Sequence, residues 1–269
     1  MNKVVILAAG RGTRMRREVP GMRLDEQQRR MAEQGLKGLI PFRGHAFLDY
    51  VISAAADAGL GSVCLVVRPE PDPIRVYYEG RETERVRIEF AVQEEPLGSA
   101  HALLAAESFA SEDPFLVINS DNYYPAPLLA RMHGLEGSGM AGFQREALIA
   151  GGNIPAERVA AYALVTTDAD GFMTDIIEKP DPATVRALEG RSWVSMTCWR
   201  FGPSIFQACR SITPSIRGEY ELPDAVRYAI RELGERFRVI PVDEPVLDLS
   251  SREDIPSVAE WLRGGEVRL

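Results

Sequence analysis

The first fifteen residues constrain the fold most strongly, because an apolar run leads directly into a glycine-containing loop. Residues 4–8 are apolar and largely β-branched, and the loop GRGTRM follows at residues 10–15. A short apolar run that ends at glycine is typical of a buried parallel strand. Glycine-rich turns after such strands present backbone N–H groups to anions. The N-terminus therefore predicts an α/β protein that holds phosphate at the end of its first strand.

The alternation of strand and helix patterns continues through the first half of the chain. Apolar residues recur at helical spacing over residues 46–60, and a β-branched run follows at 62–67. Strand, helix and strand patterns then come in turn at 86–93, 99–110 and 114–122. This order predicts a mostly parallel sheet with helices on both faces, and such sheets bind ligands at the carboxyl ends of their strands.

The second half has a different pattern. Residues 160–180 predict two strands around an Asp-Gly turn, residues 192–201 predict a third strand, and residues 221–235 predict a helix. Residues 238–264 return to the strand and helix pattern of the first half, with two further strands and a final helix. Because the sequence contains no repeat and no long linker, we expect one domain with an antiparallel lobe rather than two domains.

A charged insertion separates the first loop from the next apolar segment. In residues 16–35, Asp25 is placed to cap a short helix that ends at Gly35. Such a segment could form a surface lid over the loop. A solvated insertion without a role is the alternative for so charge-rich a stretch.

Composition excludes several classes of protein. The net charge of -8 argues against a nucleic-acid surface, which usually needs a basic face. No apolar run approaches the ~20 residues of a membrane helix, and the residues after Met1 do not form an export signal, so we expect a cytoplasmic protein. Cys64, Cys198 and Cys209 have neither zinc nor disulfide spacing, and we expect reduced core residues.

Lysine is rare in this chain. Only three of the 31 Lys and Arg residues are lysine, namely Lys3, Lys37 and Lys179. In a chain with this bias, the two internal lysines suggest positions where a compact ammonium is needed and a planar guanidinium does not suit. Chance is the alternative explanation.

The loop itself fits neither of two common phosphate-binding motifs. A dinucleotide fingerprint needs a third glycine or alanine where this chain has Met15, and an acidic residue about 20 positions further on at a strand end. A Walker loop needs a Gly-Lys-Ser/Thr sequence, which does not follow. What remains is a turn whose backbone N–H groups act together with Arg11 and Arg14 on phosphate oxygens.

Seven segments, in order, make the chain resemble the sugar-1-phosphate nucleotidylyltransferases over nearly its whole length. They are LAAGRGTRM (7–15), KGLIPF (37–42), QEEPLGSAHAL (93–103), NSDN (119–122), IIEKP (176–180), RGEYELPDAV (217–226) and VLDLSSREDI (246–255). The resemblance implies an α/β three-layer sandwich of the nucleotide-diphospho-sugar transferase (GT-A-like) kind. Its central sheet would be mixed, mainly parallel and Rossmann-like, with a small antiparallel sugar-binding lobe.

The resemblance also implies a division of labour and a reaction. Residues 1–135 would mainly bind nucleotide, 136–245 would mainly bind sugar phosphate, and 246–269 would supply a metal-binding aspartate and the last helix. In this family a sugar 1-phosphate attacks the α-phosphorus of a nucleoside triphosphate, which yields a nucleotide sugar and pyrophosphate with Mg²⁺ as the cofactor. Gln93 favours dTTP or UTP, because its amide can both donate to and accept from a pyrimidine edge.

The family's residue roles carry over to matching positions of this chain. The resemblance implies nucleotide binding by Leu7, Ala8, Ala9, Gly10, Arg11, Gly12, Thr13, Gln93, Pro96, Leu97, Gly98 and Ser99. It implies catalytic cations at Arg14, Lys37 and Lys179, and metal ligands at Asp121 and Asp248. It implies sugar-phosphate binding by Asn122, Tyr162, Glu178, Lys179, Ser195, Thr197 and Arg217.

Departures from the family pattern leave the acceptor open. Tyr162-Ala163 stands where relatives have a Tyr-Gly or Phe-Gly pair. Many relatives also carry an Asn and small residues before the strand that here reads Ser195-Met196-Thr197. An unusual sugar or a cyclitol phosphate is therefore also an expected acceptor. The alternatives are cytidylyl or guanylyl transfer to another phosphorylated alcohol, and a nucleotide-binding homologue without catalysis. A glycosyltransferase is disfavoured, since SDNYY lacks the second Asp of an Asp-x-Asp motif. Apolar surface in the second half would suit a homo-oligomer.

Overall fold

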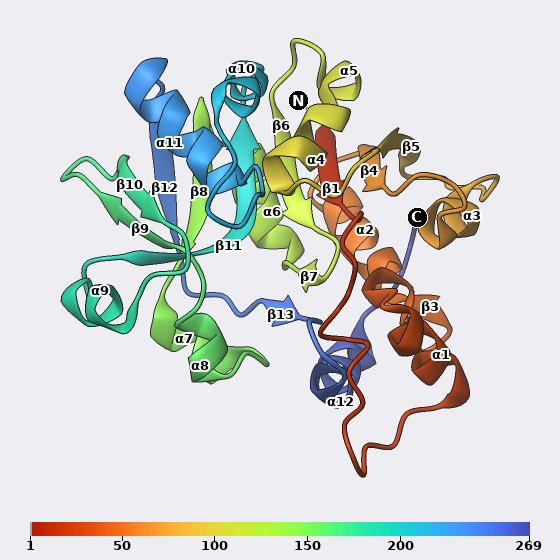
Figure 1. The fold of residues 1–269 in the computed structure, drawn as a ribbon. Helices are drawn as coiled ribbons and strands as arrows, with labels where there is room; N and C mark the ends of the chain where they lie inside the picture. Colours follow the sequence, from red (N-terminus) through yellow and green to blue (C-terminus); the bar gives the residue numbers. More distant parts are fainter. Residues whose placement is uncertain (1) are drawn as a thin grey trace.

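One nine-stranded sheet runs through both halves of the chain (Figure 1). The computed structural model describes residues 2–269. The strand order is β10-β9-β11-β6-β1-β4-β5, and β8 pairs with both β11 and β12. The strands are β1 (Lys3–Leu7), β2 (Pro41–Phe42), β3 (His45–Ala46), β4 (Ser62–Val67), β5 (Arg87–Val92), β6 (Phe115–Asn119), β7 (Asn122–Tyr123), β8 (Ser138–Phe143), β9 (Leu164–Thr167), β10 (Met173–Ile177), β11 (Trp193–Phe201), β12 (Phe237–Val242) and β13 (Leu247–Asp248).

Helices cover both faces of this sheet. They are α1 (Glu26–Gln34), α2 (Phe47–Asp57), α3 (Pro73–Tyr78), α4 (Ser99–Ala105), α5 (Glu107–Ala110), α6 (Ala126–His133), α7 (Arg145–Gly151), α8 (Ala156–Val159), α9 (Pro182–Ala187), α10 (Ser204–Ser211), α11 (Leu222–Glu232) and α12 (Ile255–Trp261). Short 3₁₀ turns are η1 (Lys37–Leu39), η2 (Arg252–Asp254) and η3 (Leu262–Gly264). None of the helices in residues 2–269 is long and apolar enough to cross a membrane.

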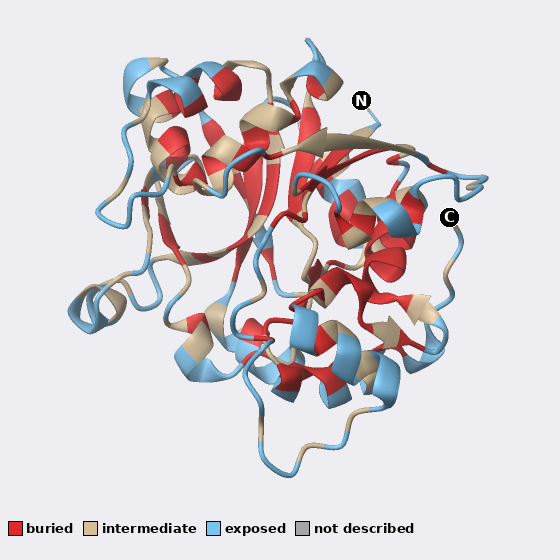
Figure 2. Ribbon diagram, turned by 45° about the vertical axis from the view of Figure 1, so that its right-hand side comes forward, coloured by how far each residue is buried: buried red, intermediate tan, exposed pale blue. Residues whose placement is uncertain are grey.

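The alternation of side chains along the strands produces two cores. Val4 and Ile6 of β1 face the core formed with α2 and α6, whereas Val5 between them faces the core formed with α4, α10 and α11. Buried strands therefore lie between helices whose outer faces are exposed (Figure 2). The expected α/β sandwich, with a mixed sheet between two helical layers, is confirmed.

The parallel and antiparallel parts of the sheet meet at β6 and β11. β1 pairs in parallel with β4 and β6, and β4 pairs in parallel with β5. β11 runs antiparallel to β6, β8 and β9. Its register shifts between Ser195 and Trp199, and Thr197 within this break has φ of +58°. The break is stabilised by Tyr124, whose hydroxyl donates to the Met196 carbonyl. Ser195 and Thr197 at this break line a cavity.

The charged insertion forms the predicted short helix. Asp25 caps α1 by accepting from the Gln28 N–H at 2.8 Å, and Gly35 ends the helix with φ of +72°. A Cβ on Gly12 would lie only 2.1 Å from the Gly35 carbonyl oxygen. The end of the insertion therefore packs against the loop after β1, and this contact excludes any side chain at position 12.

The sequence prediction omitted several elements, among them β8, α6 and α10, and it joined two helices into one. Strand β8, SGMAGF, was not predicted, because glycine and alanine are poor strand formers. Close packing explains its composition: a Cβ on Gly142 would lie 2.4 Å from Val239 Cγ1 of the neighbouring β12. The predicted helix over residues 99–110 is divided at Ala106 into α4 and α5.

The three cysteines lie in the core, as expected. Cys64, Cys198 and Cys209 are buried and unpaired. Burial raises the pKa of each thiol to about 12, so these thiols are protonated at neutral pH.

Candidate active site

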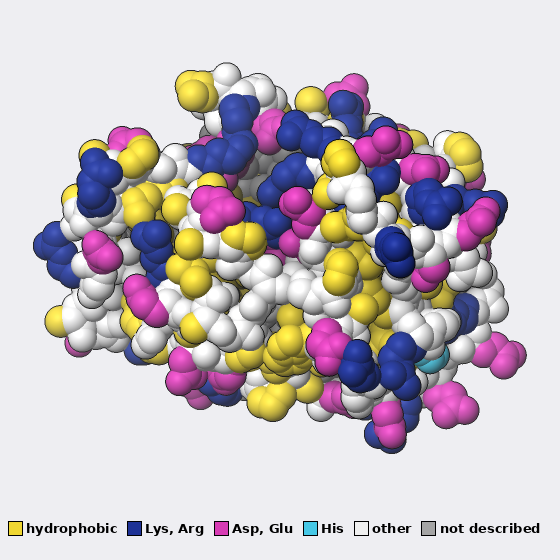
Figure 3. Space-filling model, turned by 90° about the horizontal axis from the view of Figure 1, so that it is seen from below, with side chains coloured by type: hydrophobic (Ala, Val, Ile, Leu, Met, Phe, Trp, Pro, Cys, Tyr) yellow, Lys and Arg dark blue, Asp and Glu magenta, His cyan; other side chains and the backbone are white. Residues whose placement is uncertain are grey.

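Two adjoining cavities open at the carboxyl ends of β1 and β6. The loop cavity, about 530 Å³, lies against the loop after β1. The lobe cavity, about 550 Å³, lies between β11, the 217–223 segment and Asp248. Ser99, Asn119, Asp121 and Glu219 line both cavities, so the two form one continuous site. Acidic and basic side chains gather around a hollow on one face of the molecule (Figure 3).

The predicted nucleotide-binding residues gather around the loop cavity. Of these residues, only Leu97 does not line it. Lys37 and Asp121 also line this cavity. Arg14 lines the lobe cavity instead. Sequence reasoning missed the part of the wall that comes from the end of the insertion and from β4 and α3, namely Gly35, Leu36, Gly38, Arg68 and Ile74.

Gly98 allows two segments of the loop cavity's wall to approach closely. Its φ is +113°, and a Cβ here would lie 2.4 Å from the Tyr220 carbonyl oxygen. The Tyr220 N–H donates to the Leu97 carbonyl at 2.7 Å, and the Ala100 N–H donates to the Tyr220 carbonyl at 2.9 Å. These bonds join the PLGSA turn to the segment that carries Arg217.

Gln93 is buried beside this turn with a fixed amide orientation. Its Nε2 donates to the Gly98 carbonyl at 3.1 Å and lies 3.4 Å from His101 Nδ1. Because a carbonyl can only accept, the NH₂ of Gln93 must face Gly98. The Oε1 atom has no partner among residues 2–269 and is available to a donor in the loop cavity.

Lys37 and Asp121 form an ion pair where the two cavities meet. The distance from Lys37 Nζ to Asp121 Oδ2 is 2.8 Å, and the two side chains are 15% and 24% exposed. Asp121 Oδ1 has no hydrogen-bond partner within residues 2–269. A cation and an open carboxylate oxygen thus stand side by side at the border of the two cavities.

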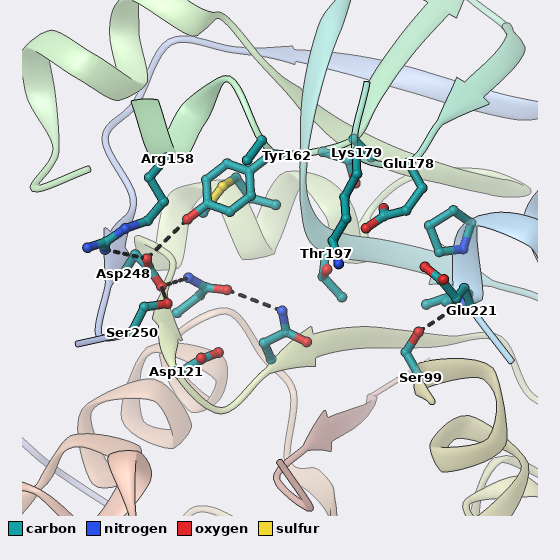
Figure 4. Close-up of a pocket in the computed structure, with 18 of the residues that line it drawn as sticks. Ser99, Asp121, Arg158, Tyr162, Glu178, Lys179, Thr197, Glu221, Asp248 and Ser250 are labelled. Carbon is teal, nitrogen blue, oxygen red and sulfur yellow. Dashed lines mark hydrogen bonds and ion pairs between the residues drawn. The ribbon is translucent and has the colours of Figure 1, made fainter. Parts of the chain in front are cut away.

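Asp248, at the end of β13, faces the same border and is almost fully buried. Its Oδ1 accepts from Asn122 Nδ2 at 3.2 Å and from Ser250 Oγ at 2.8 Å. Its Oδ2 accepts from Arg158 Nη1 at 2.8 Å and from the Tyr162 hydroxyl at 3.0 Å. Figure 4 shows Arg158, Tyr162 and Ser250 around this carboxylate, with Asp121 nearby.

The opposite wall of the lobe cavity carries glutamates and two cations. Arg217 Nη2 lies 2.5 Å from Glu221 and 3.9 Å from Glu178. Burial, with the nearby charge of Glu221, raises the pKa of Glu178 from 4.5 to about 6. Lys179 adopts φ of +46° and extends into the cavity (Figure 4). Its ammonium makes no hydrogen bond within the described chain, so it remains available to an anion.

The predicted acceptor-side residues share this cavity. All of them line it, together with both predicted metal ligands, as follows: Asn122, Tyr162, Glu178, Lys179, Ser195, Thr197, Arg217, Asp121 and Asp248. The break in β11 brings Ser195 and Thr197 to the wall. Their placement in one cavity is the arrangement that the predicted roles require.

Two arginines that bind the segment around Asp248 and Asp254, or belong to it, were not predicted from the sequence. Arg158 bridges Asp248 and Asp254, with Nη1 3.0 Å from both oxygens of Asp254. Arg252 is 7% exposed, and donates from Nε to the Met15 carbonyl at 3.0 Å and from Nη2 to the Arg16 carbonyl at 3.2 Å. Arg252 lies within the VLDLSSREDI segment, but no local pattern marks the contacts of either arginine, because the partners lie far away along the chain.

The carboxylates suit a hard divalent cation that arrives with an anionic ligand. Burial and the neighbouring Asp121 carboxylate raise the pKa of Asp248. No cluster of three or more acidic, His or Cys side chains in residues 2–269 could hold a metal ion alone. Mg²⁺ is usually bound by one or two carboxylates together with substrate phosphates, so this donor set fits it.

Comparisons with known proteins agree with this architecture. The structure of UDP-glucose pyrophosphorylase complexed with UDP-glucose superposes with a TM-score of 0.74 at 18% identity, covering 99% of this chain and 100% of that one. UTP–glucose-1-phosphate uridylyltransferase AglF of Haloferax volcanii is 31% identical over 256 residues, which cover 94% of this chain and 93% of AglF. Glucose-1-phosphate thymidylyltransferase of Streptomyces griseus is 27% identical, and the match covers 85% of this chain and 57% of that protein.

The family assignment rests on nearly the whole chain. The nucleotidyl transferase family model matches residues 3–261, which include the loop after β1, both cavities and α12. Together with the similarity to AglF over most of both chains, this match shows that the chain belongs to the nucleotidyl transferase family.

Proposed function

We propose that this chain is a magnesium-dependent nucleotidyltransferase that joins UTP or dTTP to a sugar 1-phosphate, releasing pyrophosphate. The observation that carries the proposal is the meeting of the two cavities at Lys37 and Asp121. A triphosphate in the loop cavity and a phosphate in the lobe cavity would meet at this pair. The names of the relatives AglF and the S. griseus thymidylyltransferase agree with these substrates.

The reaction is an in-line displacement at the α-phosphorus. An oxygen of the acceptor phosphate forms the new P–O bond, the bond to the bridging oxygen of the β-phosphate breaks, and pyrophosphate leaves. The nucleophile is already ionised, so no protein base is required. Lys37 would stabilise charge on the α-phosphate, while Lys179 and Arg217 would hold the acceptor phosphate.

The fixed amide of Gln93 supports uracil or thymine as the base. Its Oε1 accepts, and the N–H of Gly98 has no acceptor within residues 2–269. The N3–H and the adjoining carbonyl of uracil or thymine offer a donor and an acceptor, which complement this pair. Cytosine has an acceptor at N3 and would face Oε1 unfavourably.

Pyrophosphate release tests the proposal directly. Each ribonucleoside triphosphate and dTTP is incubated with Mg²⁺ and a panel of sugar and cyclitol 1-phosphates. We expect release from UTP or dTTP that depends on one acceptor. The cyclitols belong in the panel because Ala163 and the Ser195–Thr197 stretch depart from the family pattern. Triphosphate binding without release from any pair would contradict the proposal and favour a nucleotide-binding homologue.

Magnesium dependence is tested at Asp121. Bound Mg²⁺ would supply positive charge at the α-phosphate, and Asp121 and Asp248 are the residues that would hold it. Asp121→Asn is expected to raise the Mg²⁺ concentration at half-maximal activity about 10-fold or more, because the variant loses a charged ligand. Asp57→Asn, which alters an exposed pair with Arg85, is the control. Superimposable magnesium titrations of Asp121→Asn and the parent would remove Asp121 from the metal site.

Arg252 is expected to position the loop after β1. Arg252→Met removes both hydrogen bonds to the Met15 and Arg16 carbonyls. We expect triphosphate binding, measured by calorimetry, to weaken about tenfold, since bonds from a charged donor contribute ~1.5–3 kcal/mol. Arg263→Met, an exposed arginine of the same terminal segment, should bind like the parent. Equal affinities for Arg252→Met and the parent would show that this tether does not order the loop.

The raised pKa of Glu178 predicts an acid limb in the pH profile. Its carboxylate can accept acceptor hydroxyls only above pH about 6, and the acceptor's phosphate also takes up a proton near pH ~6. Below that pH, log kcat/KM for the acceptor should fall with a slope of about two in the parent and about one in Glu178→Gln. Glu33→Gln, exposed on α1, serves as control and should keep the parent profile. Equal slopes in Glu178→Gln and the parent would contradict this role.

A further inference from the structure

All hydrogen-bonding positions of the Asp248 carboxylate are already filled. A carboxylate offers about four lone-pair sites. Asn122 and Ser250 donate to Oδ1, and Arg158 and Tyr162 donate to Oδ2. A metal ion can therefore reach this carboxylate only if one of these donors gives up its position.

Arg158 is the donor whose presence matters most, because it brings a full positive charge. Its side chain is 15% exposed, and its ion pairs connect Asp248 with Asp254, two carboxylates that are 3% and 4% exposed. Nη2 also lies 3.4 Å from Ser251 Oγ. The guanidinium thus already neutralises Asp248 from the side of α8.

Asp121 presents the opposite situation. One of its oxygens pairs with Lys37, and the other has no partner in the described chain. Its side chain is also more exposed than that of Asp248. The two carboxylates are therefore unequal: Asp121 keeps one oxygen open beside its ion pair with Lys37, whereas both oxygens of Asp248 are fully bonded.

We propose that Arg158 competes with the divalent cation for Oδ2 of Asp248, so that the free protein binds the metal weakly. The proposal rests on the metal site of the proposed function. Asp121 supplies the first carboxylate, and Asp248 joins only when the guanidinium bond at Oδ2 is exchanged. Triphosphate oxygens would then supply the remaining ligands, which couples metal binding to nucleotide binding.

Binding of Mn²⁺ in the absence of nucleotide tests this competition without reference to activity. The probe is Mn²⁺, whose free concentration is followed by electron paramagnetic resonance. Arg158→Gln should bind Mn²⁺ about tenfold more tightly than the parent, because it loses a charged competitor. The matched control is Arg131→Gln, which removes a partly exposed pair with Glu244 remote from both cavities. It should bind Mn²⁺ like the parent.

Thermal unfolding provides a second measurement on the same proteins. Removing Arg158 leaves Asp248 and Asp254 buried without a counter-ion, so the midpoint of Arg158→Gln should fall. Mn²⁺ should raise this midpoint more than it raises that of the parent, because a ligand that binds the native state stabilises it by RT ln(1 + L/Kd), where L is the free ligand concentration, and this is larger for the tighter-binding protein. A lowered midpoint that Mn²⁺ does not restore would contradict the competition.

Further variants keep the test decisive if Arg158→Gln does not fold. Tyr162→Phe removes only the neutral donor to Oδ2 and should tighten Mn²⁺ binding by a smaller factor, about threefold. Adding Asp248→Asn to either variant should abolish the gain. Parent-like or weaker Mn²⁺ affinity in Tyr162→Phe and in folded Arg158→Gln would overturn the proposal. Failure of pyrophosphate release in the parent would instead contradict the proposed function.

Discussion

Lys37→Met is expected to lower kcat for pyrophosphate release by about 10³-fold. The Lys37 ammonium lies 2.8 Å from Asp121, where the two cavities meet, and only 15% of its side chain is exposed. Negative charge develops on the α-phosphate and the leaving oxygen during displacement. A fixed cation in a poorly hydrated site therefore stabilises the transition state more than it stabilises the bound substrates. The measurement is steady-state kinetics with both substrates saturating.

Lys3 offers a matched control for this variant. Its ammonium pairs with Asp113 at 2.7 Å and donates to the Ala110 carbonyl, at the opposite end of β1. Lys3→Met therefore removes a lysine ion pair of similar length without touching either cavity, and kcat should be unchanged. A Lys37→Met protein with parent-like circular dichroism and a kcat within about threefold of the parent would exclude Lys37 from transition-state stabilisation.

Lys179→Arg is expected to lower kcat/KM for the acceptor by about 10²-fold while leaving triphosphate affinity unchanged. Lys179 lines only the lobe cavity, and its ammonium has no partner among residues 2–269. A guanidinium keeps the charge, but its planar fork is larger and needs a different approach to phosphate. The positive φ of Lys179 fixes the start of the side chain and limits how far a longer one can adjust.

Separate binding and turnover measurements identify the role of Lys179. Calorimetry with the triphosphate should give equal affinities for the variant and the parent, whereas acceptor-dependent kcat/KM should differ. Lys3→Arg is the control for the same chemical change at an unrelated ion pair. Unchanged acceptor kinetics in Lys179→Arg would remove Lys179 from the site, and weakened triphosphate binding would assign it to the other substrate.

The features that the sequence predicted well are local ones. Strand β4 begins and ends at the residues that its β-branched run predicts, and Asp25 and Gly35 bound α1 as their cap preferences predict. These patterns depend on neighbouring residues alone. The glycine-poor strands and the capped helices were therefore predictable, whereas β8 was not, because its glycines are required by β12 and β11 packed against it.

The sequence by itself determined the α/β class, the alternation of strands and helices in much of the first half, and the loop and residues expected to form the site. It could do so because periodicity, turn chemistry and motif order are properties of short segments. Only the tertiary structure decided that Arg14 lines the lobe cavity, that Arg252 tethers the loop, and that Arg158 neutralises Asp248. The Arg158 and Asp248 positions are 90 residues apart, and Arg252 and Met15 are 237 apart. A long charged side chain takes whichever buried acceptor the packed core brings within reach, and no local pattern specifies that choice.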